Sequence, residues 1–269
     1  MSVKDDYLLF RESNGLRTNN FEDRVKLQLY LRSRLEDIWE EKPKFSNGGL
    51  FVNHMTGFAI GFAYYDCKPT KFCRSRCYGL PIAGINDYYM LRLAVITSES
   101  LKKADKRYLT HLIPKIRELE YLKIGHWGDA AREQIPTIAN IIRENKQTKF
   151  WWYTRKLEIA TMANGLGLRN LRAYLSLDPY TEYPKASEYP YGITYLVGDG
   201  LYHPNHEEIL NDRRLVAIFP LKKGVSIEDL RNDARVGPHP KLCEEKVRYA
   251  DSRQRGYDTC FECDSRCCY

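Results

Sequence analysis

The chain has 269 residues, of which 43% are hydrophobic and 13% aromatic. This composition is enough to build a packed core and excludes a wholly disordered chain. The formal net charge is +7, from 42 basic and 35 acidic residues. So mild an excess of positive charge does not require a nucleic-acid partner.

Neither a membrane segment nor a secretory signal is expected. No stretch approaches the roughly 18 continuous apolar residues that a spanning helix needs. The N-terminal sequence MSVKDDYLLFRES has no apolar segment behind a basic one. We therefore expect a cytoplasmic protein that does not bind membranes.

The N-terminal part is predicted to hold one helix. Residues 1–20 are polar and are interpreted as a loose arm. Residues 21–41 carry apolar side chains every three or four positions, which predicts a helix that ends at Lys42-Pro43. Residues 47–53 are predicted to form a turn and a short strand.

From residue 57 onward, short strands and longer helices alternate. Strands are predicted at 57–65, 121–126, 148–153, 171–177, 192–197 and 214–219. Helices are predicted at 87–120, 134–145 and 155–164. Pro114 is expected to break or kink the first of these helices. This alternation is typical of βαβ units and a parallel sheet.

The eight cysteines are clustered. Three of them, Cys67, Cys73 and Cys77, lie on one predicted loop after a strand. Three thiolates can bind three irons of a [4Fe-4S] cluster and leave the fourth iron open. Radical S-adenosylmethionine enzymes use such a loop, usually as C-x3-C-x2-C, whereas the spacing here is C-x5-C-x3-C. A zinc knuckle or unligated structural thiols are the alternatives.

A second group of cysteines lies near the C-terminus. It comprises Cys243, Cys260, Cys263, Cys267 and Cys268. Four thiolates suffice for a tetrahedral zinc site or for a second cluster. A flexible tail with incidental cysteines is the remaining interpretation.

Polar residues follow four successive predicted strands. They are His126, Gly128 and Asp129, then Tyr153, Thr154 and Arg155, then Ser176 and Asp178, then Asp199 between two glycines. The carboxyl ends of parallel strands form one face, so we expect these groups to converge with the first cysteine loop. Each residue taken alone would be read as a loop residue or a helix cap.

Two further features have plain structural interpretations. His203 and His206 are interpreted as surface-loop residues rather than zinc ligands. The basic residues Lys102, Lys103, Lys106 and Arg107 are interpreted as a solvated helix face, with nucleic-acid contact as the alternative.

Five short motifs carry a family resemblance. In chain order they are CYG at the end of the first cysteine loop, GHWGDA, FWWYTRK, SLD and the final C-x2-C-x3-C. In this order they resemble the phage gene-product-eighty-eight family, over roughly residues 50–269. Members of that family look like radical S-adenosylmethionine-type proteins with a Cys-rich C-terminus. The chain departs from the family pattern at Cys268, which follows the last family cysteine, and at Cys243, which lies about twenty residues beyond Phe219.

The resemblance implies a set of site residues. Gly128, Asp129, Tyr153, Thr154 and Arg155 would bind the cofactor. The final group of metal ligands would be Cys260, Cys263 and Cys267, with Cys243 upstream.

The expected fold is α/β, a complete or partial parallel (βα) barrel with an N-terminal helix and an irregular Cys-rich C-terminal cap. The corresponding regions are residues 1–50 for the arm and helix, 51–221 for the iron–sulfur domain and 222–269 for the cap.

The expected function is that of an iron–sulfur enzyme of radical S-adenosylmethionine type with an unknown substrate. Cys67, Cys73 and Cys77 would hold a [4Fe-4S] cluster whose open iron binds S-adenosylmethionine. The candidates for gripping cofactor or substrate are Asp129, His126, Arg155 and Asp178. A second cluster or zinc would sit at the C-terminus, and an electron donor such as flavodoxin or ferredoxin would be a partner. A phage-encoded chain would work in the host cytoplasm.

The alternative function belongs to a different class. It is a non-enzymatic, zinc-stabilised protein whose basic surface binds nucleic acid. The identity of the bound metal distinguishes the two hypotheses.

Overall fold

The computed structural model describes residues 2–53, 57–75, 77, 87–197, 200–220 and 227–243. Within these ranges the chain forms a seven-stranded, mostly parallel sheet and ten α-helices. None of the helices within them is long and apolar enough to cross a membrane.

The N-terminal region is more ordered than the sequence analysis expected. Helix α1 (Val3–Ser13) replaces the predicted loose arm, and that expectation is wrong. Ser2 caps α1 in a reciprocal capping box with Asp5, while Val3 and Tyr7 are buried. The predicted helix over residues 21–41 is confirmed as α2 (Phe21–Ser33) and α3 (Leu35–Glu40), separated by a break at Arg34.

The sheet follows the order of the sequence. Its strands are β1 (Phe51–Asn53), β2 (Gly57–Ile60), β3 (Tyr121–Ile124), β4 (Lys149–Thr154), β5 (Leu171–Leu177), β6 (Ile193–Val197) and β7 (Leu215–Pro220). Among the strands of the described residues, only β1 is antiparallel to its neighbour, and β2 to β7 pair in parallel. The predicted strands from residue 121 onward are confirmed within two residues of their expected bounds, whereas the strand expected at 57–65 ends at Ile60.

The remaining helices follow the strands. They are α4 (Lys71–Ser75), α5 (Asp87–Lys103), α6 (Lys106–Arg117), α7 (Ile135–Glu144), α8 (Leu157–Gly165), α9 (His206–Leu210) and α10 (Ile227–Asn232). Two 3₁₀ turns, η1 (Tyr64–Asp66) and η2 (Arg132–Gln134), complete the set. Pro114 was expected to break or kink the helix, and the break is not found there, because α6 continues through this residue. The break lies instead at Ala104, which has a φ of 51°, and at Asp105, whose side chain caps α6.

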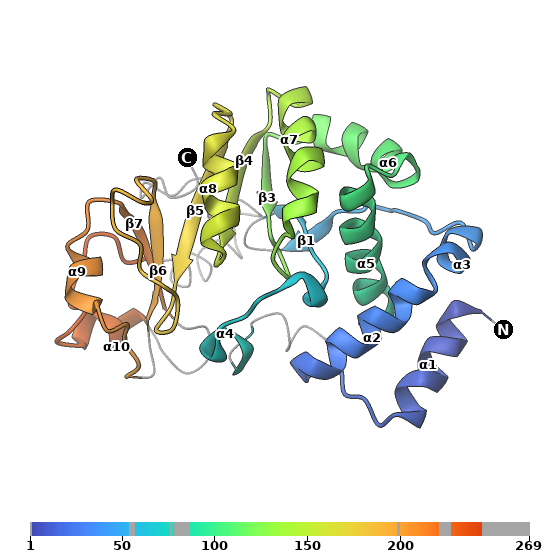
Figure 1. The fold of residues 1–269 in the computed structure, drawn as a ribbon, viewed down its shortest axis with the longest axis horizontal. Helices are drawn as coiled ribbons and strands as arrows, with labels where there is room; N and C mark the ends of the chain where they lie inside the picture. The colour runs from blue at the N-terminus through green and yellow to red at the C-terminus, as the bar shows by residue number, and fades with distance from the viewer. Residues whose placement is uncertain are drawn as a thin grey trace.

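Sequential strand order places the helical connections on one side of the sheet, because parallel crossovers are right-handed. Figure 1 shows α5, α7 and α8 along one face of the strands. The main core lies between these helices and the sheet, and includes Phe150 and Trp152 from β4. The short helix α4 lies below the strand tips in this view.

The sheet is curved. Strands β4 and β7 are separated by two others, yet the ring centroids of Tyr153 and Phe219 are only 5.6 Å apart. A flat sheet, with strands about 4.8 Å apart, would hold such residues about 14 Å apart. The curvature does not produce a closed barrel, because among the described residues β7 pairs only with β6 and with an isolated bridge at Leu242. A complete barrel is therefore not found.

Candidate functional site

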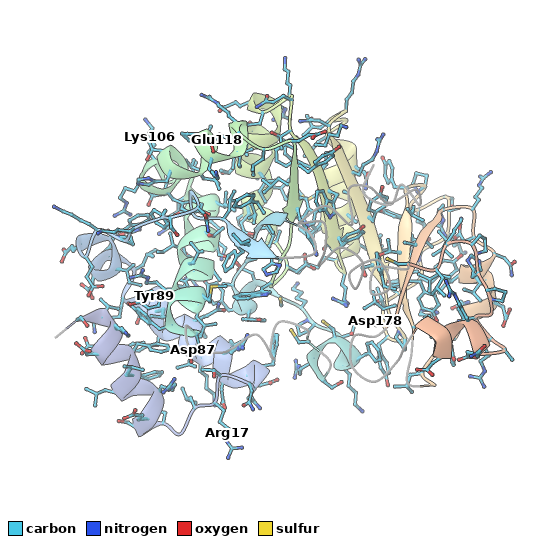
Figure 2. The ribbon with its side chains drawn as sticks, turned by 180° about the vertical axis from the view of Figure 1, so that it is seen from behind. Arg17, Asp87, Tyr89, Lys106, Glu118 and Asp178 are labelled. Atoms are coloured by element: carbon cyan, nitrogen blue, oxygen red, sulfur yellow. The ribbon has the colours of Figure 1, made fainter. Side chains whose placement is uncertain are left out.

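The carboxyl ends of β2, β3, β4 and β5 are joined by one set of polar contacts. The first cysteine loop follows β2, Asp129 follows β3, Arg155 follows β4 and Asp178 follows β5. Figure 2 shows Asp178 at the strand tips, beside the short helix α4. The structure thus joins the cysteine loop with Asp129, Arg155 and Asp178, while Asp199, which was expected to converge with them, lies outside the described residues.

Asp129 connects the ends of β3 and β4. Both of its carboxylate oxygens lie 2.8 Å from the hydroxyl of Thr154, which donates to them. The backbone N–H groups of Arg155 and Ala130 also donate to Asp129, at 3.1 and 2.9 Å. Burial raises the pKa of Asp129, although Lys156 and these hydrogen bonds oppose the shift. The carboxylate therefore binds to groups of the protein itself.

Asp178 connects β5 to the cysteine loop and to β4. Its side chain is fully buried. Its Oδ2 accepts hydrogen bonds from the Thr70 hydroxyl at 2.5 Å and from Nε of Arg155 at 3.2 Å. Its Oδ1 accepts from the backbone N–H of Tyr180 at 2.9 Å. Asp178 thus holds three segments that are far apart in the sequence.

Lys156 is a cation at the centre of the site that the sequence analysis did not select. Its Nζ donates to the backbone carbonyls of Asp66 and Ala130, at 2.5 and 2.6 Å. Asp66 directly precedes Cys67, and Ala130 directly follows Asp129. The positive charge of Lys156 opposes the rise in the pKa of both residues.

The three cysteines of the first loop are partly buried. Burial is the main cause that raises the pKa of Cys67 well above its usual value, and the charges of Asp129, Cys73 and Cys77 add to it. Burial also raises the pKa of Cys73 to about 11, against the opposing charge of Arg155. The thiols thus lie close enough to influence one another's ionisation. Among the described residues, however, no three His, Cys, Asp or Glu side chains are already placed as ligands of one metal ion.

Tyr64 lies beside the thiols and is bound by Arg24. The Arg24 guanidinium donates to the Tyr64 hydroxyl at 2.8 Å. Burial raises the pKa of Tyr64, and the charges of Cys77 and Cys67 contribute. Tyr64 is therefore neutral and adjacent to the thiols.

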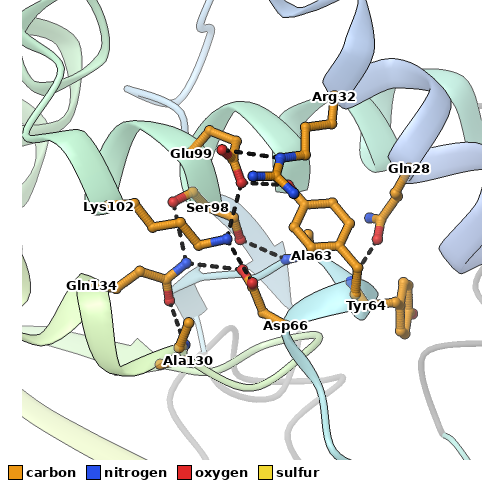
Figure 3. A network of polar contacts seen from close by, with 12 residues as sticks. Gln28, Arg32, Ala63, Tyr64, Asp66, Ser98, Glu99, Lys102, Ala130 and Gln134 are labelled. Carbon is orange, nitrogen blue, oxygen red and sulfur yellow. Dashed lines mark hydrogen bonds and ion pairs between the residues drawn. The ribbon is translucent and has the colours of Figure 1, made fainter.

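A second polar network holds the segment that leads to Cys67 (Figure 3). Asp66 accepts from Nζ of Lys102 at 2.7 Å and from Nε2 of Gln134 at 3.0 Å. Lys102 also bonds Glu99, which pairs with Arg32 at 3.2 Å. The network fixes η1 to helices α2 and α5, so the cysteine loop begins from a rigid point.

Gly128 is required by backbone geometry. Its φ is 68°, and a Cβ atom there would lie 2.4 Å from the carbonyl oxygen of Phe62. The two segments are also joined by a hydrogen bond of 2.7 Å from the N–H of Phe62 to the carbonyl of Trp127. Gly128 therefore brings the β2 and β3 loops together.

Two other predicted site residues pack against aromatic rings. The buried ring of His126 lies 5.1 Å from that of Trp127 and 5.8 Å from that of Phe51. Tyr153 stacks on Tyr174 at 5.6 Å on the curved face of the sheet. Both rings therefore have aromatic neighbours in the structure.

The second cysteine group is described only at Cys243, whose buried backbone N–H donates to the carbonyl of Ile218 at 2.8 Å. Cys260, Cys263, Cys267 and Cys268 lie outside the described residues, as does Asp199.

His203 and His206 are buried, so their interpretation as surface-loop residues is wrong. Nδ1 of His203 accepts from the N–H of Asn205 at 2.9 Å, and Nδ1 of His206 lies 3.1 Å from the Tyr195 hydroxyl. Both rings hold the β6–α9 connection through hydrogen bonds to the protein.

The basic helix segment is largely neutralised. Lys102 belongs to the buried network described above, and Arg107 pairs with Glu36 and Asp105 at 2.8 and 2.7 Å. The expectation of a fully solvated face is wrong for Lys102, and the segment offers less free positive charge to a nucleic acid than its sequence suggested.

Fold and site together define an α/β protein of the singly wound parallel class, with a cysteine- and carboxylate-bearing site at the carboxyl edge of its sheet. The profile of the Gene product 88 family matches residues 31–194, which is more than half of the chain. The chain therefore belongs to the Gene product 88 family. The match includes the first cysteine loop and Asp178, and it ends before the C-terminal cysteines. No match to a curated protein or to a solved structure was found.

Proposed function

We propose that the chain binds a [4Fe-4S] cluster at Cys67, Cys73 and Cys77 and works as an enzyme of radical S-adenosylmethionine type on a partial (βα) barrel. The observation that supports this proposal is the grouping of three partly buried cysteines in the segment that follows the first parallel strand, beside the polar ends of β3 to β5.

The donor set fits an iron–sulfur cluster. Thiolates are the ligands that such clusters require, and a bound metal deprotonates thiols whose pKa burial has raised. Arg155 and Lys156 supply positive charge close to these thiols, which offsets the negative charge of a thiolate-bound cluster.

When bound, the cluster and S-adenosylmethionine would supply the radical chemistry, while the protein positions and shields them. The role of Arg155 is to bind a carboxylate or phosphate of the cofactor or substrate through its planar guanidinium. Its side chain is 23% exposed at the edge of the sheet, and its Nε is held by Asp178. Asp129 and Asp178 orient the surrounding loops through the hydrogen bonds they accept.

The test is metal analysis after anaerobic purification and reconstitution with iron and sulfide. We expect about four irons and four sulfides for the first cluster. With reduced flavodoxin or ferredoxin as the electron donor, we expect reductive cleavage of S-adenosylmethionine to methionine and 5′-deoxyadenosine. Cys73→Ala is expected to lose the first cluster, whereas Cys243→Ala, remote in sequence from the loop, retains it.

Two results would overturn the proposal. Zinc alone, with no iron uptake after reconstitution, would favour the zinc-stabilised alternative. An unchanged iron content in Cys73→Ala would contradict the ligand assignment. The C-terminal cysteines are proposed to hold a second cluster or zinc, which the same assay detects as metal that persists in Cys73→Ala.

A further inference from the structure

Thr70 forms two hydrogen bonds that join the cysteine loop to a distant strand. Its hydroxyl donates to Oδ2 of Asp178 at 2.5 Å, across a sequence separation of 108 residues. The same oxygen accepts the backbone N–H of Cys73 at 3.0 Å. The backbone carbonyl of Thr70 also accepts from the N–H of Arg74 at 2.9 Å. Thr70 is therefore the N-cap of α4 and is itself anchored to β5.

Helix α4 depends on this anchor because it has only five residues. So short a helix is marginal without tertiary contacts. Cys73 is its third residue, so the direction of the Cys73 thiol follows from how the first turn of α4 is held.

The other partner in the contact is rigid. Asp178 is fully buried and also accepts from Arg155 and from the N–H of Tyr180. Its own backbone N–H donates to the Thr181 hydroxyl at 3.1 Å. A carboxylate held by this many donors is suited to fix another segment of the chain. It is less suited to reversible binding of a substrate.

We infer that the contact between the Thr70 hydroxyl and the Asp178 carboxylate, here called the Thr70–Asp178 latch, positions Cys73 over the carboxyl edge of the sheet for metal binding. Thr70 and Asp178 act through α4 and are positioning residues. The metal-binding half of this inference rests on the proposed function, whereas the latch itself does not.

The test compares Thr70→Val, which removes the hydroxyl at nearly constant volume, with Thr70→Ser, which keeps it. Thr110→Val, on the exposed face of α6, is the matched control. Amide hydrogen exchange of the peptide containing α4 is measured in the metal-free protein. We expect about tenfold faster exchange in Thr70→Val only, which corresponds to about 1.4 kcal/mol.

Metal loading is the second measurement. After anaerobic reconstitution, Thr70→Val is expected to take up less iron and show weaker visible cluster absorption than the wild type, and Thr70→Ser to restore both. Unchanged exchange in Thr70→Val would overturn the latch. Faster exchange with normal iron uptake would overturn its role in positioning Cys73. If the wild type itself takes up no iron, the proposed function fails, while the exchange data still decide whether the latch exists.

Discussion

The ammonium group of Lys156 lies 2.5 Å from the backbone carbonyl oxygen of Asp66, the residue that precedes Cys67. The same group lies 2.6 Å from the carbonyl of Ala130, the residue that follows Asp129. One side chain at the end of β4 thus fixes the loops that follow β2 and β3. It also places a positive charge beside the thiol and carboxylate of the site.

Replacement of Lys156 by Met is expected to destabilise the protein. It leaves two backbone carbonyls without their donor, and each unsatisfied buried acceptor costs about 1–3 kcal/mol. We expect the free energy of unfolding, measured in urea, to fall by about 2–6 kcal/mol. Lys106→Met, an exposed position on α6, is expected to change it by less than about 0.5 kcal/mol. Equal stability of the two variants would show that the Lys156 contacts contribute nothing.

Replacement of Gly128 by Ala is expected to be severe, whereas the same change at Gly165 is not. Gly128 has a positive φ, and an added Cβ would meet the carbonyl of Phe62. Nothing lies within 4 Å of a Cβ at Gly165. Because backbone cannot move aside cheaply, we expect a loss of about 2–4 kcal/mol for Gly128→Ala. Urea unfolding measures this, and similar midpoints for both variants would contradict the role assigned to Gly128.

Glu99 is expected to make the protein sensitive to acid. Burial alone would raise the pKa of Glu99, but Lys102, Tyr65 and Arg32 together lower it. A carboxyl whose pKa is lowered by folding contributes stability above its unfolded pKa, which is lost as the pH falls through the folded value. Stability is therefore expected to decline as the pH drops below 4.5, the ordinary value for this carboxyl.

Glu99→Gln tests this expectation. The variant is less stable at pH 7, and its stability changes less steeply between pH 5 and pH 3 than that of the wild type. The exposed Glu133→Gln serves as the control and is expected to retain the wild-type slope. Identical slopes in all three proteins would exclude Glu99 as a source of the acid sensitivity.

The thiol of Cys73 is expected to react slowly in the metal-free folded protein. Burial raises its pKa to about 11 from the ordinary value of 9.0. Two pKa units reduce the thiolate fraction at pH 8 about a hundredfold, and the thiolate is the reactive form. Peptide mass spectrometry after iodoacetamide treatment measures the rate, which is expected to rise about a hundredfold in urea. Equal alkylation rates in native and unfolded chains would contradict the burial of this thiol.

The raised pKa of Cys73 also affects stability. The stability that this thiol contributes below pH 9 is lost as the pH rises through 11, since the folded state binds its proton more tightly.

Much of the scaffold could be predicted from local patterns. The predicted bounds are close to the observed ones for the strands from 121 to 219 and for the helices at 135–144 and 157–165. Hydrophobic periodicity and turn residues are local signals, which can be read from a few neighbouring residues. The N-terminal helix α1 was missed, since its polar surface conceals the buried pair Val3 and Tyr7. The break at Ala104 was also missed, because its positive φ has no sequence signal in a non-glycine residue.

The residues of the site were likewise predictable only in part. Strand-end residues such as Asp129 and Asp178 could be selected because parallel strands bring their carboxyl ends to one edge. Lys156 and Thr70 could not, because their importance lies in contacts with Asp66 and Asp178 across 90 and 108 residues.

The amino-acid sequence by itself determined the alternation of strands and helices, the clustering of the cysteines and the recurrence of polar residues after successive strands. These are local properties, set by backbone propensity and side-chain periodicity. Only the tertiary structure decided that the sheet stays open over the described residues and that the carboxylates of Asp129 and Asp178 bind the protein's own donors. It also decided that one lysine joins three strand ends, since such contacts depend on how distant segments pack.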